Sequence, residues 1–178
     1  MTPDFGIRLH SIARSLEYVI LPTVDASNSL AHEQLAIALG HLAVLQQQWQ
    51  YQADYLAQCL AEMYPLGHAL AKAAEGGSAT DAARHALGAE IDRQPSTAPL
   101  FTATERHDVV AHAVDTLIIA GHRDGSDKFR RELRQLVLDH GARQSLRDRV
   151  WFAATGFDPA RVNFPEIRAL VTAGIAAS

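Results

Sequence analysis

The stretch that decides the fold is SLAHEQLAIALGHLAVLQQQWQYQADYLAQCLAEMY, Ser29–Tyr64, which contains no proline and only one glycine, Gly40. Its apolar residues recur at three-and-four spacing, the period of an amphipathic helix. These residues are Leu35, Ala38, Leu42, Leu45, Trp49, Leu56 and Met63. At 1.5 Å per residue the helix would run roughly 50 Å and would need other helices along its length. The sequence therefore predicts an all-α bundle of about six to eight helices around a long central helix at 29–64.

Proline and glycine divide the rest of the chain into further helices. Pro22 and Pro65 are expected to end or break helices, and Gly141 is expected to end one. The expected ranges are about 3–22, 66–75, 78–93, 104–123, 127–140, a second piece after 141, and 165–174. Segment 94–102, QPSTAPLFT, is predicted to be an extended connection and the best place for a lid.

The helix starts and the buried faces also follow from local sequence. Ser78 or Thr80 is expected to cap the helix that follows the Gly76-Gly77 pair, and Ser126 or Asp127 the helix after the DGSD turn. The first helix has one apolar face, which we expect to pack inside the bundle. That face consists of Phe5, Leu9, Ile12, Leu16, Val19 and Ile20.

Composition fits one globular domain over residues 1–178. Apolar residues make up 48% of the chain and charged residues 20%, which excludes a disordered chain. The single cysteine, Cys59, cannot form an internal disulfide and suits a reducing compartment. No segment reads as a membrane span or a signal peptide, so we expect a cytoplasmic protein without a membrane partner. No basic-aromatic pattern suggests nucleic acid.

The charges are distributed unevenly. Residues 123–149 carry eight Lys/Arg and five Asp/Glu within a chain of net charge −4. Lys128, Arg131 and Arg134 share one helix face and could hold the phosphates of a nucleotide or of coenzyme A. The interspersed carboxylates favour exposed ion pairs at helical spacing as the simpler interpretation.

Uncharged polar side chains flank the apolar seam of the long helix. The candidate set for ligand binding or for an interface is His41, Gln48, Trp49, Gln52 and Tyr55. Hydrogen-bonding groups at the edge of an apolar surface can line a pocket. They can equally occupy a subunit interface, or form a half-solvated boundary layer.

A metal site finds less support in the sequence. Neither the Glu-x-x-His pairs of di-metal bundles nor a His-Glu-x-x-His motif occurs. Asp108, His112 and Asp115 share a helix face at i, i+4 and i+7, and they are the fallback ligands if a metal is bound. They lie opposite the apolar side of their own helix, so we expect a solvated face, no cofactor and no metal. Motifs for nucleophilic catalysis are also missing from the chain.

The segment SLEYVILPTVDASNSLAHEQLAIALGHLAVL, residues 15–45, carries a helix that ends in Leu21-Pro22, a short loop and a long alanine-rich helix. This N-terminal third resembles an uncharacterised bacterial all-helical family often encoded beside acyl-CoA dehydrogenases and aminoglycoside-phosphotransferase-like kinases. The resemblance carries no catalytic motif. It implies that the protein accompanies acyl-CoA chemistry.

The sequence thus favours a non-catalytic accessory or binding protein that acts through a helical surface and self-associates as a homodimer. A protein partner or an anionic small molecule is the expected binding partner. The alternative is a helical bundle that binds, or acts on, an acyl-CoA or a nucleotide-like molecule. A metal-binding helical bundle is the third possibility.

Overall fold

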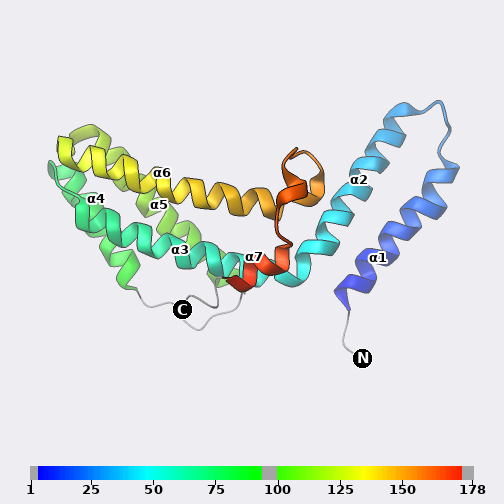
Figure 1. The fold of residues 1–178 in the computed structure, drawn as a ribbon, viewed down its shortest axis with the longest axis horizontal. Helices are drawn as coiled ribbons and strands as arrows, with labels where there is room; N and C mark the ends of the chain where they lie inside the picture. Colours follow the sequence, from blue (N-terminus) through cyan, green and yellow to red (C-terminus); the bar gives the residue numbers. More distant parts are fainter. Residues whose placement is uncertain (1–3, 94–99, 174–178) are drawn as a thin grey trace. The chain divides into compact units, whose positions relative to one another are not determined.

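The computed structural model describes residues 4–93 and 100–173 and confirms the all-α fold, with no strand in these residues (Figure 1). Short 3-10 and π turns join the α-helices. The α-helices are α1 (Phe5–Ser15), α2 (Ser29–Gln48), α3 (Gln52–Ala73), α4 (Ser78–Asp92), α5 (Leu100–Asp124), α6 (Asp127–Trp151) and α7 (Ile167–Ala173).

The contacts within the chain group it into two compact units. Residues 1–52 and 147–178 form the first, which we call the hairpin unit because α1 and α2 are its two longest complete helices. Residues 53–146 form the second, the bundle unit, which contains most of α3, all of α4 and α5, and most of α6. That 1–178 folds as a single domain stays a prediction.

The four helices of the bundle unit enclose a continuous apolar core. Leu87 from α4, Leu117 from α5 and Phe129 from α6 are completely buried. Each lies on the apolar side of its helix, as its spacing from the neighbouring apolar residues requires. The rest of the core cluster comprises Leu66, Leu70, Ala83, Ile91, Val114, Ala120 and Leu133.

Two loops at one end of the bundle are bound to each other. The Gly77 N–H donates to the Asp124 carbonyl at 2.9 Å, and the Ser126 N–H donates to the Glu75 carbonyl at 2.8 Å. A Cβ on Gly76 would lie 2.6 Å from the Cα of Gly125 and 2.7 Å from the Asp124 carbonyl oxygen. The loops can therefore approach this closely only because glycine has no side chain.

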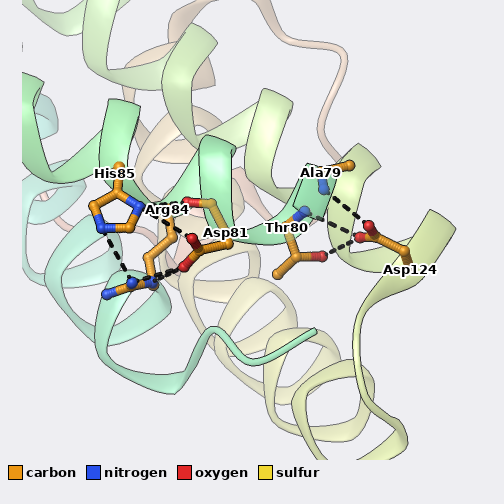
Figure 2. Close-up of polar contacts among 6 residues, drawn as sticks. All are labelled: Ala79, Thr80, Asp81, Arg84, His85 and Asp124. Carbon is orange, nitrogen blue, oxygen red and sulfur yellow. Dashed lines mark hydrogen bonds and ion pairs between the residues drawn. The ribbon is translucent and has the colours of Figure 1, made fainter. Parts of the chain in front are cut away.

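Asp124 caps the helix that begins in the neighbouring loop (Figure 2). Its carboxylate accepts hydrogen bonds from the N–H groups of Ala79 and Thr80 at 2.9 and 3.0 Å, and from the Thr80 hydroxyl at 2.6 Å. The expectation that Ser78 or Thr80 caps α4 was wrong, because the N-cap residue is Gly77 and it has no side chain. Ser126 does cap α6, since its hydroxyl accepts from the Phe129 N–H at 3.1 Å.

A buried arginine ties three helices together within the same unit. The Arg106 guanidinium on α5 donates to the Tyr64 hydroxyl of α3 at 2.9 Å and to the Glu90 carboxylate of α4 at 3.0 Å. It also donates to the carbonyls of Glu90 and Arg93, where α4 ends. The side chain is only 12% exposed. Arg106 therefore satisfies carbonyls that the end of α4 leaves without helical partners.

Two helix-breaking residues do not break their helices. α3 continues through Pro65 to Ala73, and α6 continues through Gly141 to Trp151. Both breakers are exposed, whereas Leu66, Leu70 and Val150 on the same two helices are buried. Packing of the flanking turns therefore outweighs the local cost of the breaker.

The predicted central helix is helical throughout, but it is not one uninterrupted α-helix. A 3-10 turn at Trp49–Tyr51 separates α2 from α3. At the other connection, α5 already begins at Leu100, so the last residues of the predicted extended segment 94–102 are helical. The remainder of that segment, with the lid assigned to it, lies outside the described residues.

The hairpin unit begins with two antiparallel helices (Figure 1). Asp4 caps α1 by accepting from the Ile7 N–H at 3.1 Å, and Asn28 caps α2 by accepting from the Ala31 N–H at 3.1 Å. A π turn at Leu16–Ile20 and a 3-10 turn containing Pro22 end the first helix near the expected position. Over the described ranges, every helix is too short or too polar to cross a membrane.

We call the contact between the two loops, together with the cap that Asp124 places on α4, the clasp. Replacing Asp124 tests it. We expect Asp124→Ala to lower the melting temperature by several degrees, because α4 loses its only side-chain cap. Asp115→Ala, on the exposed side of the same helix, serves as the matched control and should leave Tm unchanged. Thermal unfolding followed by circular dichroism measures both variants, and equal Tm values would refute the role of the clasp.

The same clasp predicts a dependence on pH. The hydrogen bond from the Thr80 hydroxyl, together with those from the two N–H groups, holds the pKa of Asp124 below its ordinary value of 3.8. A depressed pKa stabilises the fold above the unfolded value and loses that effect as pH falls through the folded value. We therefore expect the stability difference between wild type and Asp124→Ala to shrink below pH 3.8 and to stay constant above pH 6.

Removing the buried arginine should cost more than removing an exposed one. We expect Arg106→Ala to lower the free energy of unfolding by roughly 1–3 kcal/mol, because the partly buried Tyr64 hydroxyl and the carbonyls at the end of α4 lose their donor, while Glu90 keeps its ion pair with Arg93. Arg123→Ala, at an exposed position near the end of α5, is the control and should change it by less than about 0.5 kcal/mol. Urea unfolding gives both values, and similar losses in the two variants would contradict the prediction.

Candidate functional site

The α1–α2 hairpin buries little of its own apolar surface. Leu9 is the only buried residue of α1, and Val44 and Gln48 are the only ones of α2. Large apolar side chains of the hairpin are exposed by about half, although the sequence predicted that most of them would be covered. They include Phe5 at 53%, Ile12 at 50%, Val19 at 60%, Leu30 at 65%, Ile37 at 46%, Leu45 at 45% and Trp49 at 38%.

These side chains form two stripes. Phe5, Ile12 and Val19 are seven residues apart and therefore lie along one side of the first helix. Leu30, Ile37 and Leu45 are seven and eight residues apart and lie along one side of α2. We call the two stripes together the apolar face.

The two stripes meet at one end of the hairpin. The ring of Phe5, at the beginning of one stripe, packs against the ring of Trp49 with centroids 5.8 Å apart. Trp49 follows Leu45 by one helical turn and lies next to the end of the other stripe. This contact joins the two stripes at that end.

The α2 half of the apolar face is poor in charge, whereas on the α1 half the exposed Arg8 lies between Phe5 and Ile12. Between residues 29 and 52 the only charged side chain is Glu33, whereas α6 carries eleven charged side chains in a helix of similar length. A solvated helix usually has charges on its exposed positions. Depletion of charge together with exposed aliphatic and aromatic residues is typical of the centre of a protein–protein interface.

The C-terminal part of the same unit shows how α2 is covered when a partner is present. The Gln48 amide donates to the Trp151 carbonyl at 2.8 Å, and both residues are buried. The segment continues through a turn held by Arg149, whose guanidinium donates to Asp158 at 2.7 Å. It covers the end of α2 that contains Val44 and Gln48, and the surface nearer the hairpin tip stays uncovered.

The other side of the hairpin is different in character. A groove of about 490 Å³ runs between α1 and α2 there. Its polar lining comes from His10, Arg14, Glu17, Tyr18 and Gln46, above a floor of alanine and leucine. The Arg14 guanidinium lies 5.5 Å from the centre of the Tyr18 ring. The apolar and polar sides of the hairpin are therefore distinct surfaces.

The structure does not bring the five candidate residues of the long helix into one described site. His41 and Gln52 are exposed, Trp49 joins the apolar face, and Gln48 is used in the bond to Trp151. Tyr55 is buried in the bundle unit. Their role in a ligand pocket stays a prediction.

The predicted anion and metal residues are all exposed. Lys128, Arg131 and Arg134 lie on the solvent side of α6, and none of them pairs with a carboxylate in the described parts of the chain. The fallback metal ligands are exposed on α5; they are Asp108, His112 and Asp115. Within the described ranges, no three His, Cys, Asp or Glu side chains gather as a metal would require.

The most concentrated group of titratable side chains is Asp81, Arg84 and His85 on α4 (Figure 2). The Arg84 guanidinium donates to the Asp81 carboxylate at 2.7 Å, and a ring nitrogen of His85 lies 2.8 Å from the Asp81 carbonyl. All three are residues of one exposed helical surface, and the neighbouring Thr80 hydroxyl is committed to Asp124. This group lacks a nucleophile and an enclosing pocket, so we interpret it as a surface ion-pair cluster.

Sequence reasoning missed the apolar face because it assigned the α1 stripe, together with Leu45 and Trp49, to the interior and did not single out Leu30 or Ile37. The absence of charge from residues 29–52, apart from Glu33, was the signal that could have revealed it. Comparisons of the chain with protein-family models, with curated proteins and with solved structures found no match.

Proposed function

We propose that the chain is a non-catalytic binding protein that associates with a second copy of itself through the apolar face of the α1–α2 hairpin. The observation that carries the proposal is the row of half-exposed apolar side chains on a hairpin whose second helix carries only one charged residue, Glu33. Two helices packed only on each other cannot hide such a surface, and a second hairpin laid on it would form a four-helix arrangement.

The size of the apolar face suits this role. Its seven side chains, together with the adjacent Ile20, expose roughly 700 Å² per copy, close to the ~800 Å² that each partner contributes to a stable interface. A monomer rarely leaves a continuous apolar patch of this size in water. Self-association is the simplest way to cover it, because every molecule in solution carries the same face.

Charged substitutions at the centre of the face test the proposal. The wild type should sediment at twice the 19.4 kDa chain mass at about 50 µM. Ile12→Glu and Ile37→Glu should each weaken association by about 100-fold or more, because the dimer would bury an unpaired carboxylate. Analytical ultracentrifugation measures the dissociation constants.

The control is Ile119→Glu, which places the same charge on an apolar side chain of α5 that is 70% exposed and lies outside the hairpin. It should leave the dissociation constant unchanged. A wild type that is monomeric at high micromolar concentration would refute the proposal. So would a dimer that all three substitutions leave intact.

The second candidate is the binding of an anionic acyl-CoA or nucleotide-like molecule. The observation in its favour is that Lys128 lines a groove of about 500 Å³ between α3 and α6, with Lys72 on the opposite wall. Neither lysine has a carboxylate partner within the described ranges. Glu75 and Glu132 also line the groove, which makes it less favourable to an anion than two lysines alone would be.

Thermal-shift measurements with coenzyme A and with ATP test this candidate. A ligand that binds only the folded state should raise Tm. At a concentration of 100 times its Kd it adds about 2.7 kcal/mol to the free energy of unfolding. The double variant Lys72→Gln and Lys128→Gln should lose the shift, because it removes both lysines that line the groove. An unchanged Tm of the wild type at millimolar ligand would contradict the candidate.

A further inference from the structure

The contact between Phe5 and Trp49 fixes the register of the two stripes. Seven residues further along the first helix is Ile12, and seven residues back from Trp49 is Leu42, beside His41. Because both helices rise by 1.5 Å per residue, Ile12 and His41 lie at about the same level. They form the middle of the apolar face.

The two ends of the face differ in bulk. The aromatic rings of Phe5 and Trp49 lie at one end, and the smaller side chains of Val19 and Leu30 lie toward the hairpin tip. If two copies docked with their aromatic ends together, four rings would separate the hairpins at that end and leave a gap at the other. Close packing requires an even separation between the two surfaces.

The C-terminal part of the hairpin unit lies at the aromatic end. Trp151 accepts a hydrogen bond from Gln48 of α2, and the 3-10 turn Ala153–Thr155 contacts the same helix. Parallel docking would bring two copies of this segment together, whereas antiparallel docking separates them by the length of the hairpin. The position of the C-terminal segment and the difference in side-chain size between the two ends therefore both favour antiparallel docking.

We infer that two copies dock antiparallel through their apolar faces, about a twofold axis that crosses the middle of the face at right angles to the helices. Ile12 then meets the partner's Ile12, and Phe5 meets the partner's Val19. The inference rests on the proposed function and specifies the arrangement of the same surface. Such an interface is closed, because each face is occupied once and no surface is left for a third copy.

Cysteine crosslinking tests the arrangement in the full-length protein. Under mild oxidation Ile12→Cys should form a disulfide-linked dimer, because two cysteines on the axis can approach within about 7 Å between Cα atoms. Phe5→Cys and Val19→Cys should each stay uncrosslinked alone, since in the antiparallel pair each is roughly 20 Å from its own copy. Mixing these two variants should produce the crosslinked dimer after subunits exchange.

Two controls accompany the test. Wild type should give no crosslink, since its one cysteine, Cys59, is buried. Ala43→Cys lines the polar groove on the other side of the hairpin and should also give none. Non-reducing gels should show about ten times more linked dimer for Ile12→Cys than for either control. Circular dichroism checks that each variant is folded.

The possible outcomes separate the two claims. A dimeric wild type in which Ile12→Cys stays unlinked, or in which the mixture of Phe5→Cys and Val19→Cys gives no crosslink, overturns the antiparallel arrangement and leaves the proposed function intact. A monomeric wild type overturns both the proposed self-association and the antiparallel arrangement. A crosslink at Ala43→Cys that equals the one at Ile12→Cys shows that the copies meet through the other side, and it also overturns the inference.

Discussion

Two helices that pack side by side can bury only the strip along which they touch. In the α1–α2 hairpin that strip contains Leu9, whereas the stripe that begins at Phe5 and the stripe that begins at Leu30 point away from it. The C-terminal segment covers one further patch at Val44 and Gln48. The rest of the apolar surface stays exposed to water, which is unfavourable. This exposure is the physical reason to interpret the hairpin as a site of association.

The bundle unit buries the apolar sides of its helices within a single chain. Its helices each face the others, so side chains such as Leu117 and Phe129 lose all contact with water. The paired loops at one end and Arg106 within the bundle supply hydrogen bonds to helix ends that would otherwise lack them. Charge follows the same division, since α2 has almost none and the exposed side of α6 is densely charged. One unit therefore has a self-sufficient core, and the other has a face that a partner can complete.

The differences from the sequence-based expectations share one cause. Pro65 and Gly141 are unfavourable inside a helix, yet both helices continue because the turns around them are packed. The cap of α4 comes from Asp124, which is distant in sequence and reaches the helix only after the two loops have paired. Sequence rules assign a helix-forming cost to each residue from its local environment alone. Tertiary contacts can offset that cost, and they can supply a cap from a residue that is distant in sequence.

The sequence alone determined the helical class, most helix positions and the direction of each apolar face, because these depend on spacing and on residues close in the chain. Leu87 and Phe129 lie on apolar helix faces that the spacing of the sequence defines, and both are completely buried. Only the tertiary structure decided which apolar faces are covered. Ile12 and Leu87 follow the same spacing rule, yet one is half exposed and the other completely buried. Periodicity records which side of a helix is apolar, whereas burial depends on whether another segment arrives to pack against it.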